Sequence, residues 1–168
     1  LGADLDAAAS ALADWRPGAG RGARAVAPTR DGGRALVIDE SYNASPEAVR
    51  AALGSLGEAP TPSSGRRIAM IGDMLELGPE SPALHSDLAD AVAAAGVSIL
   101  ITVGPLAEAL ADAAPGPIET IRAADAEMAA AAAAERLRDG DAILIKGSLG
   151  VGLRRAVDRL LAPSAKGD

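Results

Sequence analysis

The stretch from residue 66 to residue 104, RRIAMIGDMLELGPESPALHSDLADAVAAAGVSILITVG, decides the fold class of this chain. Residues 67–71 and 98–103 are short, continuous apolar runs, a pattern typical of buried parallel strands. The alanine-rich segment 82–95 between them has the composition of a helix, which we expect to end at Gly96. A strand, a helix and a second strand in this order predict one unit of a parallel sheet.

The same alternation continues over most of the chain. We expect further strands over 24–28, 34–39, 117–122 and 141–145, and further helices over 46–57, 105–114, 125–138 and 150–161. The first two of these strands flank a Gly-containing turn and are hairpin-like, which predicts one antiparallel edge. The sequence therefore predicts a Rossmann-like, doubly wound α/β fold, with a mostly parallel sheet, an antiparallel edge strand and helices on both faces.

Composition narrows the classes of protein to consider. The chain has 168 residues and a net charge of −7, with 49% hydrophobic and 1% aromatic residues. The apolar content suits a folded domain, whereas the acidic charge and the scarcity of rings argue against a nucleic-acid partner. No apolar run approaches the roughly 18–20 residues of a membrane helix, so we expect a cytoplasmic protein without membrane insertion. Cysteine is absent, which excludes thiol catalysis and thiolate metal sites.

Residues 1–20 differ from the rest of the chain. A short helix over 4–14 is followed by a Pro- and Gly-containing break. Because a helix this short is marginal alone, we expect 1–20 to be the end of a preceding domain and its linker. The main domain then spans 21–162, and residues 163–168 are a polar tail.

Ligands of a doubly wound fold bind where the parallel strands end, and polar residues follow several of the expected strands. Residues 39–43 suit a sugar hydroxyl or a base edge, or they form a loop that caps the helix at Pro46. Capping accounts for Ser45 as the N-cap. It does not account for Tyr42 and Asn43, because a cap needs only one oxygen.

The loop Lys146-Gly147-Ser148-Leu149-Gly150 resembles a phosphate cradle, since its glycines permit close backbone approach and a helix follows. A tight strand-to-helix turn explains the same residues, and the GxxxxGK[ST] order of a P-loop is absent from the chain. Asp73 and Glu76 are either a ligand or acid–base pair, or part of a solvated loop.

Two isolated residues have simple interpretations. His85 lies within the helix expected over 82–95, where a packing or surface role is the simpler one. Arg21 lies in the linker, where it either holds a phosphate or carboxylate bidentately or is a solvated arginine.

Taken in order, the strings GR, VIDESYNASP, IAMIGDMLELG, LH, VG and ILIKGSLG resemble the C-terminal domain of the Mur ligases. The resemblance covers about residues 20–161, and four of the motifs lie at ends of expected strands. Within the family, the strings are most similar to members that join D-alanyl-D-alanine to UDP-N-acetylmuramoyl-tripeptide.

The resemblance implies a three-domain, ATP-dependent ligase in which residues 1–20 end the central ATPase domain. ATP and Mg²⁺ bind mainly to that central domain, and the reaction passes through an acyl phosphate that the incoming amine attacks. The C-terminal domain closes over ATP, which excludes water and orients the amine. The family is generally monomeric.

By the same resemblance, Arg21 approaches the nucleotide phosphates and Glu40 is associated with the nucleotide. Tyr42 and Asn43 match the loop beside the adenine and ribose. The acceptor side is expected to comprise Asp73, Met74, Leu75, Glu76, Lys146, Gly147 and Ser148. No catalytic residue and no metal ligand is expected within this chain, so the isolated chain is predicted to have no ligase activity.

Some positions depart from the family pattern, and other identities stay open. Ser45 replaces a usual Asn, Ala48-Val49 replaces a common Ser-Met pair, and Leu149 replaces a frequent Arg. If that Arg contacts the acceptor carboxylate, Lys146 would be a poorer substitute, because a point charge lacks the bidentate fork. The alternatives are another Mur ligase, a folylpolyglutamate-synthase relative, or a non-catalytic Rossmann-like nucleotide-binding module.

Overall fold

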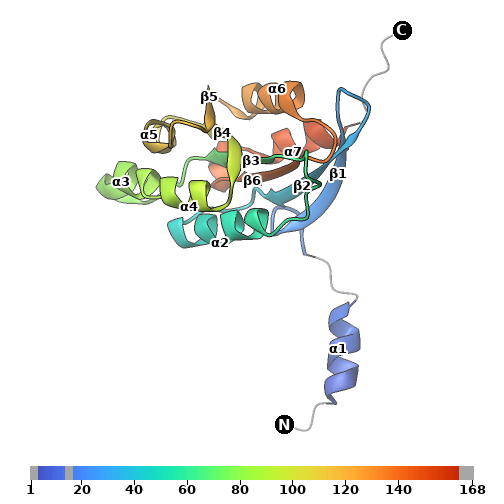
Figure 1. Cartoon of the computed structure of the whole chain (residues 1–168). Helices are drawn as coiled ribbons and strands as arrows, with labels where there is room; N and C mark the ends of the chain where they lie inside the picture. The colour runs from blue at the N-terminus through green and yellow to red at the C-terminus, as the bar shows by residue number, and fades with distance from the viewer. Residues whose placement is uncertain (1–3, 14–16, 163–168) are drawn as a thin grey trace.

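A six-stranded sheet in the order β1-β2-β6-β3-β4-β5 forms the centre of the molecule (Figure 1). The computed structural model describes residues 4–13 and 17–162. Its strands are β1 (Ala23–Pro28), β2 (Arg34–Glu40), β3 (Arg67–Gly72), β4 (Val97–Val103), β5 (Glu119–Ala123) and β6 (Ala142–Lys146). β1 pairs antiparallel with β2, and all other neighbouring strands pair in parallel. This confirms the predicted fold class.

Helices cover both faces of the sheet (Figure 1). The helices of the domain are α2 (Pro46–Gly57), α3 (Ser81–Ser86), α4 (Ala89–Ala94), α5 (Glu108–Ala113), α6 (Ala126–Arg136) and α7 (Arg154–Leu161). α6 and α7 pack on one face around Ile101 of β4, whereas α2, α4 and α5 pack on the other around Leu100. The central strands are therefore buried on both sides, which explains their continuous apolar runs.

The expected caps of two helices are present. The Ser45 hydroxyl accepts a hydrogen bond from the Ala48 amide at the start of α2, with Pro46 in the first turn. The Asp125 carboxylate accepts one from the Met128 amide at the start of α6. Both side chains accept hydrogen bonds from backbone amides of the first helical turn, which have no partner within the helix.

The single helix predicted over 82–95 is wrong, since the segment forms two helices, α3 and α4, after a 3-10 turn at Gly78–Glu80. At the break, the Leu88 amide bonds to the His85 carbonyl three residues back, which tightens the backbone as in a 3-10 turn.

Two other helices begin later than predicted. α5 begins at Glu108 rather than 105, because Gly104 has φ +98° and the following residues turn before the helix. α7 begins at Arg154 rather than 150, after a 3-10 turn at Leu149–Val151 and a left-handed Gly152.

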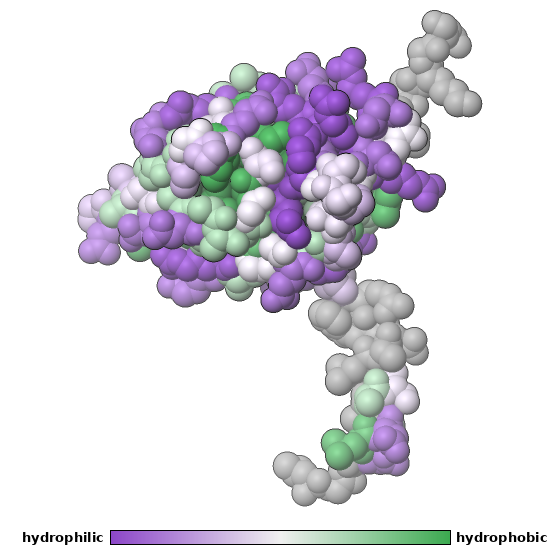
Figure 2. Space-filling model, viewed as in Figure 1, coloured by the Kyte–Doolittle hydropathy of each residue, from purple (hydrophilic) through white to green (hydrophobic). Residues whose placement is uncertain are grey.

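The N-terminal helix α1 (Leu5–Ala13) lies away from the sheet in Figure 1. Its side chains that the structure describes are all exposed, and Leu5 is 84% exposed. Figure 2 shows the resulting apolar surface on this helix. The predicted tail 163–168 lies outside the described residues. None of the helices in the described parts of the chain is long and apolar enough to cross a membrane.

Candidate functional site

The carboxyl edge of the sheet, where β2 to β6 end, carries all the predicted site residues. One pocket at this edge, which we call the Arg21 pocket, has a volume of about 260 Å³. Its lining residues are Gly20, Arg21, Glu40, Tyr42, Asn43, Ala48 and Lys146. The structure thus brings together the four residues predicted to contact a nucleotide, and it adds Lys146, which was predicted to lie on the acceptor side.

Arg21 stacks on the exposed face of Tyr42, with its guanidinium carbon 4.0 Å from the ring centroid. A cation over an aromatic ring is held by the negative face of that ring. Tyr42 is 44% exposed, and Arg21 forms no ion pair within the described residues. The stack therefore orients a positive charge that no described carboxylate neutralises.

The segment before Arg21 is docked onto the end of β2. Gly20 has φ +74°, and its amide donates to Asp39 Oδ2 at 2.9 Å. The Tyr42 amide in turn donates to the Gly20 carbonyl at 3.2 Å. A Cβ at position 20 would lie 2.9 Å from the Tyr42 Cβ, so the position requires glycine both for its dihedral angle and for space.

Asp39 is the buried group beneath this contact, with 4% of its surface exposed. Its Oδ1 accepts hydrogen bonds from the Ser41 amide at 3.1 Å and the Ser41 hydroxyl at 2.6 Å. Arg154 of α7 approaches Oδ2 at 3.4 Å. A carboxylate with this many donors is strongly held in place.

Lys146, at the end of β6, is only 3% exposed. Its Nζ donates to the Asn43 carbonyl at 2.9 Å and lies 3.5 Å from Glu40 Oε2. Burial lowers the pKa of Lys146 below its ordinary value, while Glu40 opposes the shift. Glu40 and Lys146 are aligned in the β2–β6 register, which explains why residues so distant in sequence meet here.

The loops after β3 and β6 lie side by side, because the two strands are paired in parallel and their carboxyl ends meet at the same edge of the sheet. The Ser148 amide donates to the Asp73 carbonyl at 3.0 Å, and the Leu75 amide donates to Ser148 Oγ at 2.9 Å. A Cβ on Gly147 would lie 3.2 Å from the Gly72 Cα. The two predicted acceptor loops are thus tied to one another.

Asp73 and Glu76 are placed too differently to act as a pair. Asp73 is buried, and its Oδ1 accepts a hydrogen bond from the Ala107 amide at 2.8 Å. Glu76 is exposed at φ +65°, a conformation that costs a non-glycine residue roughly 1–2 kcal/mol. Asp73 therefore supports the turn before α5, and only Glu76 presents a carboxylate to solvent.

Met74 and His85 anchor the loop after β3 to α3. The Met74 side chain lies in the core, and its amide donates to His85 Nε2 at 2.9 Å. His85 Nδ1 donates to the Ser81 carbonyl at 2.7 Å, so the geometry fits the neutral tautomer with its proton on Nδ1. His85 is fully buried, and the packing role expected for it is confirmed.

Apolar side chains are exposed on these two loops. Leu149 is 62% exposed and Leu75 is 38% exposed. Both belong to the turns that follow β6 and β3. A ligand or domain that covers these loops would remove this apolar surface from water.

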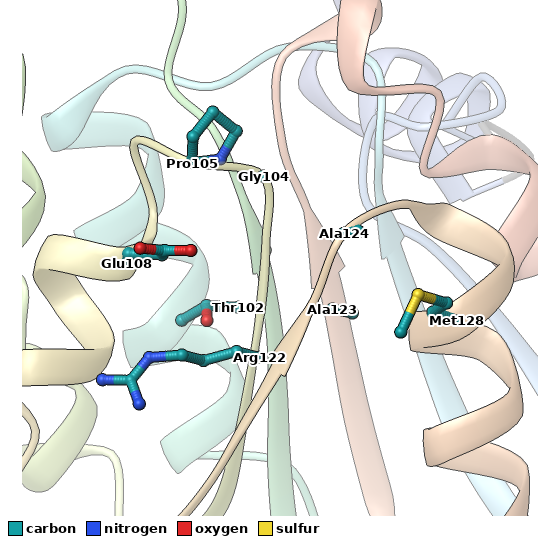
Figure 3. Close-up of a pocket in the computed structure, with 8 residues that line it drawn as sticks. All are labelled: Thr102, Gly104, Pro105, Glu108, Arg122, Ala123, Ala124 and Met128. Atoms are coloured by element: carbon teal, nitrogen blue, oxygen red, sulfur yellow. The ribbon is translucent and has the colours of Figure 1, made fainter.

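A second hollow of about 390 Å³ lies between the ends of β4 and β5, where α5 and α6 leave on opposite faces (Figure 3). In Figure 3, Arg122, Glu108 and Thr102 lie on the α5 side and Met128 on the α6 side. Arg122 is paired with Asp112. The buried Thr102 hydroxyl has no hydrogen-bond partner among the described residues. The sequence analysis assigned no role to this hollow.

Sequence reasoning also missed one support of the Arg21 pocket, Arg154. No sequence pattern indicates the contact of Arg154 with Asp39, because the two residues are 115 positions apart and meet only through the packing of α7. Within the described ranges, no group of three or more His, Cys, Asp or Glu residues could hold a metal ion.

The fold and the polar carboxyl edge define a Rossmann-like α/β domain with polar loops at the strand ends. The model of the Mur ligase, glutamate ligase domain, matches residues 26–149, and the chain belongs to this family.

Curated relatives agree on one kind of Mur ligase. The UDP-N-acetylmuramoyl-tripeptide–D-alanyl-D-alanine ligase of Escherichia coli is 36% identical over 113 residues, which cover 67% of this chain and 23% of that protein. The ligase of the same name from Rickettsia prowazekii is 33% identical over 164 residues, covering 94% of this chain and 33% of that protein. The chain thus spans a third or less of the length of these relatives.

Solved structures agree with the fold. The MurF ligase from Thermotoga maritima, in complex with ADP, superposes with a TM-score of 0.70 at 28% identity, covering 89% of this chain and 32% of that one. A MurF structure from Acinetobacter baumannii superposes with a TM-score of 0.74 at 23% identity, covering 95% and 34%. The chain therefore corresponds to the C-terminal domain of a MurF-like ligase.

Proposed function

We propose that this chain is the C-terminal domain of an ATP-dependent ligase that joins D-alanyl-D-alanine to UDP-N-acetylmuramoyl-tripeptide. In that reaction, ATP phosphorylates the tripeptide carboxylate, the dipeptide amine attacks the acyl phosphate carbonyl, and phosphate leaves as the amide bond forms. Residues 1–20 would belong to the central domain and its linker. The exposed apolar side of α1 supports this boundary, because that surface lacks cover.

The Arg21 pocket carries the proposal. Arg21 would offer its guanidinium to the nucleotide phosphates, held by the Tyr42 ring 4.0 Å away. Glu40 and Asn43 would offer acceptors and an amide to the ribose and base. Lys146 would hold this loop through the Asn43 carbonyl, so its proposed place moves from the acceptor side to the nucleotide side.

Mg²⁺ would accompany ATP and neutralise its phosphate charge when bound. Glu40 is the one carboxylate lining the Arg21 pocket, and it lies beside Lys146. Mg²⁺ takes six oxygen ligands and prefers carboxylates and phosphates, so these residues do not fit a magnesium site. We assign the metal to the central domain and route no step through it here.

The exposed surface of the loops after β3 and β6 would be the acceptor side. Asp73 and Ser148 would hold the loops together, so their part would be to position rather than to touch the dipeptide. Glu76, Leu75 and Leu149 are the exposed groups there. On closure they would help exclude water from the acyl phosphate, whose hydrolysis competes with attack by the amine.

The test is a titration of this chain with ADP and, separately, with D-alanyl-D-alanine, followed by amide NMR shifts. We expect ADP to shift residues 20–21, 40–43 and 146, and the dipeptide to shift 75–76 and 147–149. Arg21→Ala should weaken ADP binding about tenfold, the worth of one charge-assisted contact. Arg24→Ala, an exposed arginine on β1, is the matched control and should leave it unchanged.

ADP shifts centred on the hollow between β4 and β5 would contradict the proposal. If millimolar ADP causes no shift at all, the same pair of variants is compared in the full-length ligase. There, Arg21→Ala should raise the KM for ATP about tenfold relative to Arg24→Ala, and equal KM values would overturn the nucleotide role.

A further inference from the structure

The linker segment 18–22 and the loop after β2 meet around one buried carboxylate, that of Asp39. Four donors converge on its two oxygens: the Gly20 amide and Arg154 Nη1 on Oδ2, and the Ser41 amide and hydroxyl on Oδ1. The Gly22 amide also bonds to the Asp39 carbonyl at 2.8 Å. One residue therefore connects the linker, the end of β2 and, through Arg154, helix α7.

We infer that Asp39 is a positioning residue for the nucleotide site: it docks the linker so that Arg21 stacks on Tyr42 and faces the Arg21 pocket. The inference rests on the proposed function only where it concerns nucleotide binding. Asp39 is buried and is not among the residues that line the pocket, so it acts through Gly20 and Arg21 rather than on a ligand.

The geometry explains why a carboxylate is required. Both oxygens must accept, because N–H or O–H donors face each of them. An asparagine has the same shape but presents an NH₂ group at one end, which would face a donor. Asp39→Asn therefore removes hydrogen bonds without opening a cavity, and the linker loses the contact that holds Gly20.

The chain offers a matched control at the amino edge of the sheet, where the parallel strands begin. Asp141 is also buried, at 2% exposure, and also accepts from backbone amides at both oxygens, those of Arg66 and Arg138 at 2.9 Å each. Asp141→Asn creates the same chemical mismatch at the far edge of the same sheet. It separates loss of stability from loss of linker position.

The experiment compares the two variants in this chain by three measurements. These are the hydrogen exchange of the Gly20 amide, the ring-current shift of the Arg21 side chain, and ADP affinity. For Asp39→Asn we expect Gly20 protection and ADP affinity each to fall about tenfold, as for one lost charge-assisted hydrogen bond, and the Arg21 ring-current shift to disappear. Asp141→Asn should lower the unfolding midpoint but change these three readouts less than about twofold.

A second variant keeps the inference testable if Asp39→Asn does not fold. Gly20→Ala strains the linker from its own side, at φ +74° and 2.9 Å from Tyr42, and should weaken ADP binding with Asp39 intact. Unchanged Gly20 exchange and Arg21 shift in Asp39→Asn would overturn the inference, as would equal ADP losses in both aspartate variants. Failure of the wild-type chain to bind ADP would count against the proposed function alone, because the exchange and ring-current readouts need no nucleotide.

Discussion

The two edges of the sheet each carry an arginine, and the surroundings of these two arginines differ. At the amino edge, Asp141 binds Arg66 at 2.7 Å, and Arg66 also donates to the Arg136 carbonyl, so the charges neutralise one another. The hydrogen bond to Asp141 raises the pKa of Arg66 above its ordinary value. At the carboxyl edge, Arg21 is exposed and forms no ion pair with any described residue. The amino edge therefore has a closed network of charges, whereas Arg21 at the carboxyl edge has a charge without an ionic partner among the described residues.

Within the carboxyl edge there is a similar division. The loop after β3 is closed, since Asp73 and His85 form their hydrogen bonds with the protein itself. The loop after β2 is open, with Tyr42 and Asn43 exposed. This difference predicts that substitutions at the closed positions change stability and that substitutions at the open positions change binding.

Asp141→Ala tests the closed network of the amino edge most directly. The variant leaves the Arg66 guanidinium and two backbone amides without their acceptor, so we expect a loss of about 3 kcal/mol in the free energy of unfolding. Chemical denaturation of the chain gives this value from the transition midpoint and slope. The ADP affinity of the folded variant should match that of the wild type, and a tenfold loss of affinity would show that the two edges are coupled.

His85→Ala tests the closed part of the carboxyl edge. It removes the acceptor of the Met74 amide and leaves a cavity beneath the loop, so we expect a loss of about 2 kcal/mol in stability. Faster hydrogen exchange at Met74 and Leu75 should accompany it. Ser86→Ala is the matched control, because it changes a half-buried side chain on the same helix that bonds only locally, to the Ala83 carbonyl, and it should cost less than about 0.5 kcal/mol. Equal losses of stability in the two variants would contradict the anchoring role of His85.

Lys146→Met tests the boundary between the closed and open parts, and we expect its pH effect to be the smallest of the three. Burial lowers the pKa of Lys146 in the folded chain below 10.5. Between the lowered pKa and 10.5, the unfolded state binds more protons, so wild-type stability should rise with pH relative to Lys146→Met. Denaturant midpoints of both proteins over this alkaline range measure the difference, and parallel curves would contradict the assigned burial.

Much of the candidate site could be predicted from motifs in the sequence, and the differences from the structure have non-local causes. Arg21, Glu40, Tyr42 and Asn43 were predicted as one group from the resemblance to the Mur ligases, and they do line one pocket. The prediction that Lys146 belongs with Gly147 and Ser148 followed chain order. The β2–β6 register instead places its amino group beside Glu40.

Two helix predictions failed for similar reasons. The alanine-rich composition of 82–95 favours a helix throughout, but it contains no signal for the tightened turn at Leu88. The late start of α5 depends on the carboxylate of Asp73, which binds the Ala107 amide from 34 residues away. Composition cannot reveal such a contact.

The sequence by itself determined the order of strands and helices, the antiparallel edge and the loops that carry the polar groups. These features depend on the periodicity and composition of neighbouring residues, which can be read within each segment without its tertiary contacts. Only the tertiary structure decided which polar groups are free. Asp39, Asp73, His85 and Arg21 all look available in the sequence, yet the first three accept hydrogen bonds from backbone amides of other segments. The physical reason is that a buried polar group must be satisfied by whatever the fold places beside it, and strand order, not chain order, decides what that is.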